Sequence, residues 1–183
     1  MTARVNAGLG CVAALALWAD QPPAPHALVL RDFAKRVEDY TELRNRARAR
    51  IPRLKDGASP AAITHHERAL AAKIRVERAA ARPGDIFSPD IASEFQRLIG
   101  EAMKGHEATL VHQSLEHAEP VRLNLQVNVM YPANTPLQST PPTLLLYLPA
   151  LPSGLDYRVL GHDLILRDAE ANLIVDFTTG VVP

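Results

Sequence analysis

The chain has 183 residues, of which 47% are hydrophobic and 22% charged, and its 20 Lys and Arg residues balance its 20 Asp and Glu residues. This length suits one domain or two small ones, and the composition excludes a disordered tail, a collagen-like fibre and a multi-span membrane protein. Because the formal net charge is zero, no global field points to nucleic acid, and no nucleic-acid partner is expected.

Residues 1–19 have the pattern of an export signal. Arg4 supplies a positive charge near the N-terminus, and the fifteen residues from Val5 to Ala19 carry no charge. Secretory apolar segments have about 7–15 residues, whereas a membrane-spanning helix needs about 20. We predict an exported protein, periplasmic or secreted, whose signal peptide is cleaved near Ala19. An uncleaved anchor and a buried N-terminal helix are the alternatives.

The only cysteine, Cys11, lies inside this signal segment, so the predicted mature chain has none. A disulfide framework, a thiolate zinc site and a cysteine nucleophile are therefore excluded for the mature protein.

Residues 20–118 are expected to form a helical region, because their apolar residues recur every three or four positions. Three helices are predicted, and a short piece around residues 108–117 would add a fourth. The first helix is expected over Leu28–Arg50, and a proline follows it closely. The second begins at Ser59-Pro60 and ends at Pro83-Gly84. The third begins at Ser88-Pro89 and ends at Gly105. Serine caps the free N–H groups of a helix start, and proline suits the first helical position.

Residues 119–183 are expected to form an antiparallel β region, either sharing a core with the helices or standing apart from them. Apolar and polar residues alternate over Val121–Tyr131, which predicts a strand with one wet face that pairs with the strands after it. Gly161-His162 separates Asp156–Leu160 from Asp163–Arg167 as a two-residue hairpin turn, and Asn172–Phe177 adds a third strand.

The predicted fold class is therefore α+β, with N-terminal helices followed by a small antiparallel sheet that includes a C-terminal three-stranded meander. Periodicity does not assign the short apolar block Leu144–Leu148.

The common catalytic signatures are absent: the sequence has no Gly-x-Ser-x-Gly elbow, no Gly-rich phosphate loop, no His-Glu-x-x-His pair and no dinucleotide fingerprint. We predict no catalytic, cofactor-binding or metal-binding residue and expect no cofactor and no enzyme activity. Catalytic triads are geometric and can be scattered along a sequence, which keeps a hydrolase as an alternative.

The densest charged feature is a run of six cations in twelve residues without an acid: Arg44, Arg46, Arg48, Arg50, Arg53 and Lys55. A spacing of two residues does not build one basic face on a helix. Instead the side chains border both flanks of the apolar stripe, where their stems cover apolar surface. We expect solvated flanks, and the alternative is a patch over Arg44–Arg53 for an anionic component of the cell envelope.

Five histidines form the second feature: His65, His66, His106, His112 and His117. His112 and Glu116 would share a helix face and suit a divalent metal, but a zinc site needs three or four ligands. Histidines without metal are therefore expected, and a metal-responsive protein is the alternative. His66 lies near the edge of the apolar stripe of the second predicted helix, and it is placed to reach the same interface as His112 and Glu116.

Four acids gather in the hairpin region: Asp163, Asp168, Glu170 and Asp176. Asp163 and Asp168 stand where strands begin and end, so we expect turn formers rather than a catalytic carboxylate pair.

A Leu-Pro segment, a Tyr-Arg strand with a Gly turn, and a final Ile-Val-Asp strand occupy Leu148–Pro152, Tyr157–Asp168 and Asn172–Phe177. This unit, about residues 148–178, resembles the C-terminal hairpin of small exported bacterial proteins of unknown function, and it is similar to the end of periplasmic nickel/cobalt homeostasis proteins. The resemblance implies export and a link to metal homeostasis, and it carries over no site residue.

We therefore expect an exported, non-catalytic binding or structural protein of the cell envelope. The alternatives are a periplasmic metal-responsive protein and a hydrolase with dispersed catalytic residues. A pocket that holds a histidine within reach of a serine or a carboxylate would favour the hydrolase.

Overall fold

The computed structural model describes residues 24–104, 108–109, 113, 124–131 and 140–183. Helices come first and a three-stranded antiparallel sheet comes last, which confirms the predicted α+β fold with its C-terminal meander. The predicted signal peptide, residues 1–19, lies outside the described residues, as does most of the predicted helical piece at 108–117. In the described part, no helix is both long and apolar enough to cross a membrane.

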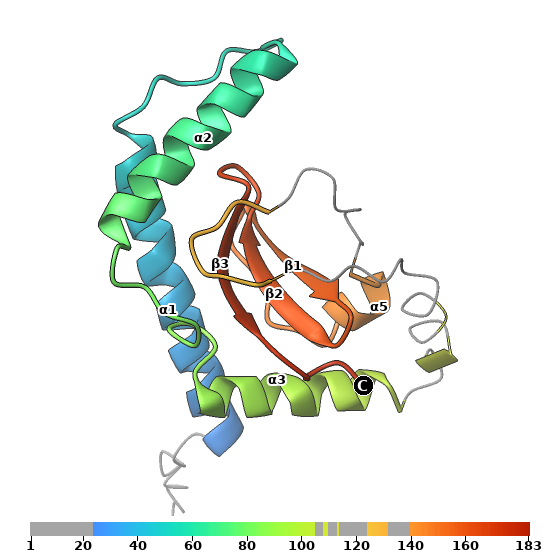
Figure 1. Ribbon diagram of the computed structural model, residues 1–183. Helices are drawn as coiled ribbons and strands as arrows, with labels where there is room; N and C mark the ends of the chain where they lie inside the picture. The colour runs from blue at the N-terminus through green and yellow to red at the C-terminus, as the bar shows by residue number, and fades with distance from the viewer. Residues whose placement is uncertain (1–23, 105–107, 110–112, 114–123, 132–139) are drawn as a thin grey trace, which may run out of the picture.

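Figure 1 shows α1 (Pro25–Arg48) and α2 (Pro60–Glu77) as an antiparallel helical hairpin beside the sheet, while α3 (Pro89–Ala102) runs beneath it. All three helices have proline in their first turn, as predicted for α2 and α3. At α2 the Ser59 hydroxyl accepts a hydrogen bond from the Ala62 N–H at 3.3 Å, which fixes the helix start.

The second helix ends earlier than predicted, at Glu77 rather than near Pro83. Arg78 leaves the helical conformation there, and its guanidinium turns inward to donate to the Val175 carbonyl of the sheet at 3.0 Å. A tertiary hydrogen bond to a buried carbonyl thus ends the helix before its proline-glycine stop.

The sheet contains β1 (Leu155–Leu160), β2 (Asp163–Asp168) and β3 (Leu173–Thr178), in that spatial order. Leu160 pairs with Asp163 across the Gly161-His162 turn, as the sequence predicts. Gly161 has a φ of 58°, a conformation that glycine adopts without a steric penalty. On its outer edge, β1 receives a hydrogen bond from the Thr140 hydroxyl to the Tyr157 carbonyl at 2.8 Å.

The strand predicted over Val121–Tyr131 is wrong over residues 124–131, the part that the structure describes. A turn interrupts it at 127–128, where Asn128 has a φ of 65°, and only Met130 forms a bridge, to Leu173. The Asn128 side chain donates to the Arg78 carbonyl at 2.8 Å and accepts from the Arg78 guanidinium at 3.0 Å, which holds the turn. The segment still lies along β3, as predicted, because the Asn128 N–H donates to the Ile174 carbonyl at 2.9 Å.

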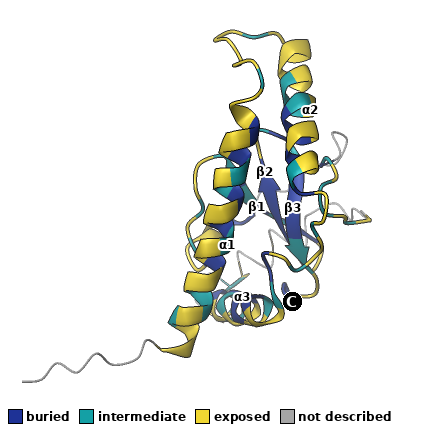
Figure 2. Ribbon diagram, turned by 90° about the vertical axis from the view of Figure 1, so that its left-hand side faces the viewer, coloured by how far each residue is buried: buried dark blue, intermediate teal, exposed yellow. Residues whose placement is uncertain are grey.

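The helices and the strands share one buried core. Its centre is aromatic: the Phe33 and Phe95 rings meet edge to face at 4.8 Å, and Phe95 meets Tyr157 of β1 at 5.9 Å. Figure 2 shows the consequence for α1 and α2, whose outer faces are exposed along most of their length while buried positions face inward. Of the short apolar block left unassigned, Leu144 and Leu145 belong to the single-turn helix α5 (Pro142–Leu145), which packs near α3, and the remaining residues follow it as a turn.

Candidate functional site

A cleft of about 650 Å³ opens where the end of α1, the loop to α2, the first half of α2 and the β2–β3 turn meet. We call it the hairpin cleft. Its apolar lining consists of Ala49, Pro52, Leu54, Ile63 and Ala169. Its polar lining consists of Asn45, Arg48, Arg53, His66, Glu67 and Glu170. The arginine run, one of the histidines and one of the hairpin acids therefore converge on the same hollow.

A buried ion pair supports the wall of this cleft. Arg44 Nε lies 3.1 Å from Asp168 Oδ2, with the two side chains 5% and 0% exposed. The Tyr40 hydroxyl donates to the same carboxylate oxygen at 2.8 Å. Burial of the hydroxyl and the neighbouring Asp168 charge raise the pKa of Tyr40 above its usual value, so this hydroxyl stays protonated and donates.

The expectation that Arg44 lies on a solvated flank is therefore wrong. The buried positions of α1 are Phe33, Val37, Tyr40, Arg44 and Ala47, which step by four and three residues. Arg44 occupies a core position of this stripe, and the spacing alone contains that signal. A charge there is tolerated because Asp168 supplies a carboxylate, since an unpaired buried charge is strongly unfavourable.

Asp168 is also the turn former that the sequence predicts. Its second oxygen, Oδ1, accepts hydrogen bonds from the backbone N–H groups of Glu170 and Ala171, both at 3.0 Å. The same carboxylate thus shapes the β2–β3 turn and binds α1, and only the first role could be read from local sequence.

Gly154 lets the Arg44 guanidinium lie flat against the backbone before β1. Arg44 donates to the Ser153 carbonyl at 3.0 Å, and Gly154 has a φ of 86°. A Cβ atom at position 154 would stand 2.2 Å from Arg44 Nη2, well inside contact distance. The positive φ and the close approach of the guanidinium therefore both favour glycine at this position.

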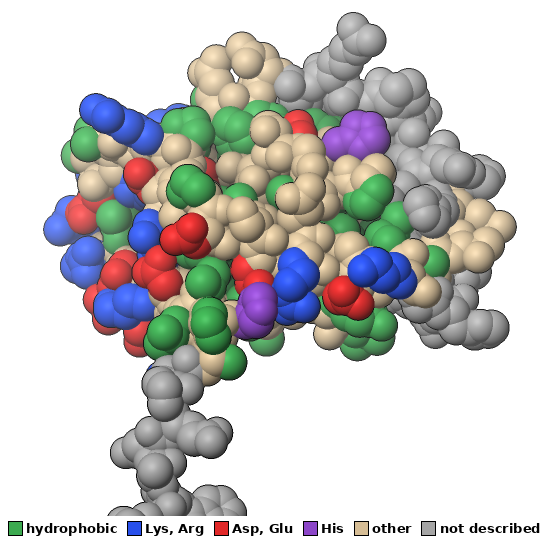
Figure 3. Space-filling model, turned by 90° about the horizontal axis from the view of Figure 1, so that it is seen from below, with side chains coloured by type: hydrophobic (Ala, Val, Ile, Leu, Met, Phe, Trp, Pro, Cys, Tyr) green, Lys and Arg blue, Asp and Glu red, His purple; other side chains and the backbone are tan. Residues whose placement is uncertain are grey.

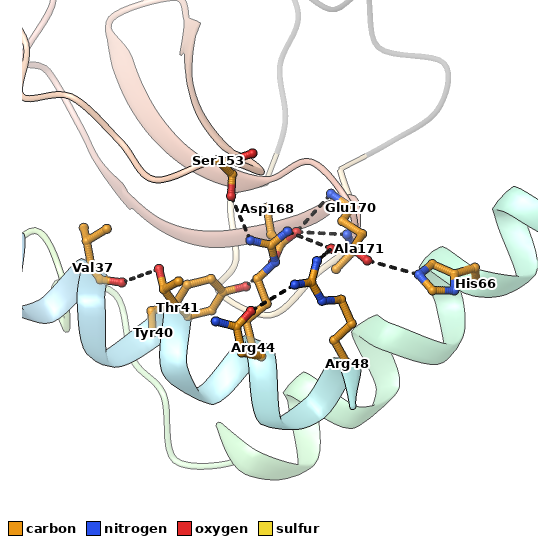
Figure 4. Close-up of polar contacts among 11 residues, drawn as sticks. Val37, Tyr40, Thr41, Arg44, Arg48, His66, Ser153, Asp168, Glu170 and Ala171 are labelled. Carbon is orange, nitrogen blue, oxygen red and sulfur yellow. Dashed lines mark hydrogen bonds and ion pairs between the residues drawn. The ribbon is translucent and has the colours of Figure 1, made fainter. Parts of the chain in front are cut away.

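Glu170 joins both helices of the hairpin to the sheet, as Figure 4 shows. Its Oε2 accepts from Arg44 at 2.7 Å and from Arg48 at 3.1 Å, and its Oε1 lies 3.2 Å from His66 Nε2. Burial by itself would raise the pKa of Glu170, but the hydrogen bonds from His66 and Arg44 outweigh it and hold that pKa below its usual value. Glu170 is therefore an anion with both oxygens engaged.

Of the other four cations of the run, two are paired with acids of the chain. Arg50 pairs with Glu77, and Arg46 lies 4.0 Å from Glu42. Among the residues that the structure describes, Arg53 and Lys55 have no ion-pair or hydrogen-bond partner. The alternative, a patch over Arg44–Arg53 for an anionic component of the cell envelope, is thus reduced to the C-terminal end of this run, which borders the hairpin cleft.

The other hairpin acids lie away from the cleft. Asp176 is fully buried, and it accepts from the N–H groups of Ile86 and Phe87 at 2.7 and 2.8 Å, which binds the α2–α3 loop to β3. Asp163 accepts from the Gly180 N–H at 3.0 Å. Asp176 therefore holds a loop from within a strand and is not part of a catalytic pair.

The remaining histidines do not gather with His66. His65 is exposed, His26 lies 2.6 Å from Glu94, and His162 lies 2.9 Å from the Val182 carbonyl. His106, His112, His117 and Glu116 lie outside the described residues. Within the described ranges, no group of three or more His, Cys, Asp or Glu residues could hold a metal ion.

Two further hollows also have charged linings, but neither brings together the arginine run, a histidine and a hairpin acid. A groove of about 700 Å³ runs along the middle of α1 beside Pro149 and is lined by Arg31, Lys35, Glu38 and Glu42. Another, of about 370 Å³, lies beside β1 and is lined by Asp156 and Arg158. On the face seen in Figure 3, acidic and basic side chains lie next to one another instead of forming a patch of one sign. The hairpin cleft is therefore the candidate site.

The lining of the hairpin cleft sets its chemistry. None of its described lining residues carries a hydroxyl or thiol group, so His66 has no side-chain nucleophile to activate there. What the cleft offers is charged hydrogen-bonding groups beside an apolar surface, an arrangement suited to binding. No family model, no curated protein and no solved structure matches this chain, and the resemblance of residues 148–178 to metal-homeostasis proteins stays a prediction.

Proposed function

We propose that this chain is an exported, non-catalytic binding protein of the cell envelope and that the hairpin cleft is its binding site. One observation carries the proposal: three members of the arginine run, one histidine and two hairpin acids, far apart in the sequence, line or support a single cleft of about 650 Å³. These residues are Arg44, Arg48, Arg53, His66, Asp168 and Glu170. Binding sites for small molecules have volumes of about 300–1,000 Å³ and combine apolar walls with a few fixed polar groups.

The polar wall of the cleft is held in place before any ligand arrives. Glu170 is fixed by Arg44, Arg48 and His66, and Arg44 is fixed in turn by Asp168. Groups that are already ordered lose little conformational freedom on binding, so more of the interaction energy contributes to affinity. This preorganisation favours a binding role over a purely structural one.

A blocked cleft tests the binding role. Ala169 is exposed and lines the cleft, so Ala169→Trp is expected to fill it; Ala72→Trp, on the exposed surface of α2, is the matched control. A panel of small envelope-derived molecules is screened by thermal shift against the mature chain and both variants. We expect compounds that stabilise the wild type and Ala72→Trp but not Ala169→Trp. Compounds that stabilise all three proteins equally would contradict a site in the cleft.

The proposed export rests on residues 1–19, with Arg4 followed by fifteen uncharged residues. Expressed with its native N-terminus in a bacterium, the protein is expected in the periplasm or the medium, beginning near Asp20. A soluble cytosolic product that retains Met1 would contradict export and leave the cleft assignment standing.

A hydrolase that activates water is the second candidate, because His66 Nε2 lies 3.2 Å from Glu170 Oε1 inside a cleft. A carboxylate can orient a histidine as a general base. Two arginines share this carboxylate, however, which weakens its effect on the imidazole. Turnover of ester, phosphate or glycoside substrates that His66→Ala abolishes and His65→Ala preserves would establish the hydrolase in place of the binding protein.

A further inference from the structure

The hairpin cleft has a surplus of hydrogen-bond donors, and from this we infer that its ligand is an amphipathic carboxylate. The inference rests on the proposed binding function and specifies the ligand class. It follows from three observations: which polar groups of the wall are already engaged, where the uncommitted charges stand, and which apolar side chains border them.

The acceptors of the wall are mostly occupied. Both oxygens of Glu170 are engaged, and the Asn45 carbonyl oxygen accepts from Arg48 Nη2 at 3.3 Å. Glu67 is the remaining acidic group, and in the described part of the chain it has no polar partner.

The donors are mostly uncommitted. A guanidinium carries five N–H donors. Arg48 uses two of its donors, toward Glu170 and Asn45, and its side chain is 50% exposed. Arg53 has no hydrogen-bond or ion-pair partner among the described residues. A ligand rich in acceptors therefore meets more partners in this cleft than a ligand rich in donors.

A carboxylate matches these donors better than a neutral acceptor does. Its two oxygens accept the parallel N–H groups of a guanidinium, and charge-assisted hydrogen bonds are the stronger kind. The cations Arg44 and Arg48 are already balanced by Asp168 and Glu170, so Arg53 is the cation left to receive the ligand's charge.

The apolar side of the cleft requires the ligand to carry an apolar body as well. Leu54 and Ile63 each leave 41% of their surface exposed, and both line the cleft. Because Arg53 lines the same cleft as these two side chains, one ligand can place its charge on Arg53 and its carbon chain on Leu54 and Ile63. Covering exposed aliphatic surface is favourable in proportion to the area removed from water.

Titration calorimetry of the mature chain with octanoate, octylamine and octanol tests the inference. We expect octanoate to bind, octanol to bind at least tenfold more weakly, and octylamine not to bind, since a charge-assisted hydrogen bond changes affinity by about tenfold or more. A leucine-terminated tripeptide with a free or an amidated C-terminus distinguishes a peptide end from a free acid as the source of the carboxylate. Preference for octylamine, or no octanoate binding, would overturn the inference.

Two charge variants give opposite expectations in the same assay. Arg53→Gln removes the cation and is expected to weaken octanoate binding about tenfold, while Glu67→Gln removes a like charge and is expected to strengthen it. Arg31→Gln, in the groove along α1, is the control and leaves binding unchanged. Octanoate binding that neither cleft variant alters would overturn the inference.

The failure of the inference and of the proposed function can be told apart. If octanoate does not bind but other compounds stabilise the protein in a manner that Ala169→Trp blocks, the cleft remains a binding site and only its ligand class is wrong. If no compound depends on an open cleft, the proposed function fails first.

Discussion

Arg44 of α1 and Asp168 at the end of β2 form an ion pair of 3.1 Å in the protein interior. Both groups are buried: the Asp168 carboxylate is fully enclosed, and the Arg44 guanidinium occupies a core position of its helix. Burying either charge without a partner would be strongly unfavourable. Each charge therefore depends on the other, and the pair fixes where the helical hairpin sits on the sheet.

Removal of the Asp168 carboxylate is expected to destabilise the protein severely. Asp168→Ala leaves the Tyr40 hydroxyl buried without its acceptor and takes from the buried Arg44 cation one of its two carboxylates, and breaking one side of a buried pair costs about 3–5 kcal/mol. Glu42→Ala is the control, because its contact with Arg46 is 4.0 Å long and exposed, and such pairs contribute about 0–1 kcal/mol. Urea unfolding measures the free energy of unfolding of both variants. Equal losses would show that the buried pair stabilises the protein no more than the exposed one does.

Gly154 gives a test of the close approach by Arg44. Gly154→Ala adds a Cβ 2.2 Å from the guanidinium and also strains a backbone with a φ of 86°. Gly180→Ala strains a similar backbone, with a φ of 67°, but meets nothing within 4 Å. The loss in unfolding free energy is expected to be larger at position 154, by roughly the 1–3 kcal/mol of an overpacked site. Equal losses at the two positions would mean that the guanidinium moves aside freely.

The Asp176 carboxylate is expected to control local opening of the α2–α3 loop. Asp176→Ala removes the acceptor of the Ile86 and Phe87 N–H groups, and leaving a buried donor unsatisfied costs about 1–3 kcal/mol. Hydrogen exchange at those two amides should accelerate by more than exchange at amides of the sheet centre. In Asp85→Ala, which loses an exposed contact with the Arg82 N–H, the protection of both amides should persist.

Acidification is expected to destabilise the fold below the usual titration range of glutamate. The folded-state pKa values of Glu94 and Glu170 lie below their ordinary values, mainly through hydrogen bonds from Arg97 and from His66 with Arg44. The stabilisation is therefore present above the unfolded pKa of about 4.3 and is lost as the pH falls through the folded pKa. Unfolding free energies measured between pH 6 and 2 should fall less steeply in Glu170→Gln than in the wild type. If the unfolding free energy of Glu170→Gln falls with pH as steeply as that of the wild type, Glu170 does not contribute to the acid sensitivity. Glu67→Gln serves as the control variant.

Metal ions are expected to leave the stability of the mature chain unchanged. The sequence pairs His112 with Glu116 and offers no third ligand at a recognised spacing. Binding at a hundredfold excess over Kd would stabilise the fold by about 2.7 kcal/mol, a plain shift in Tm. A shift of this size with micromolar nickel or zinc, abolished by His112→Ala, would establish the metal-responsive alternative.

The elements that the sequence predicted best are those with local causes. The Gly161-His162 turn and the alternation around it suffice to predict the meander, and Ser59-Pro60 suffices to predict the start of α2. Alternation misled over residues 124–131, the described part of the strand predicted at Val121–Tyr131, because Asn128 takes a left-handed conformation and bonds to Arg78. A period of two residues does not reveal such a tertiary partner.

The candidate site could be predicted only in part, for the same reason. The arginine run and the hairpin acids stand out in the sequence, but their convergence depends on how α1 docks on β2. Arg44 could have been recognised, since it follows Tyr40 by four residues in the buried stripe. Its partner could not, because Asp168 has a sufficient local explanation as a turn residue.

The shared core has a consequence for the order in which the chain is made. Synthesis delivers the helices first, yet their buried faces pack on strands that emerge after them, and Val181 and Val182 are also buried in that core. Until β1 has left the ribosome, the Phe95 ring of α3 lacks its contact with Tyr157. The core of this protein is therefore incomplete while only the helices have been synthesised, and a nascent chain at that stage exposes apolar surface that the sheet later covers.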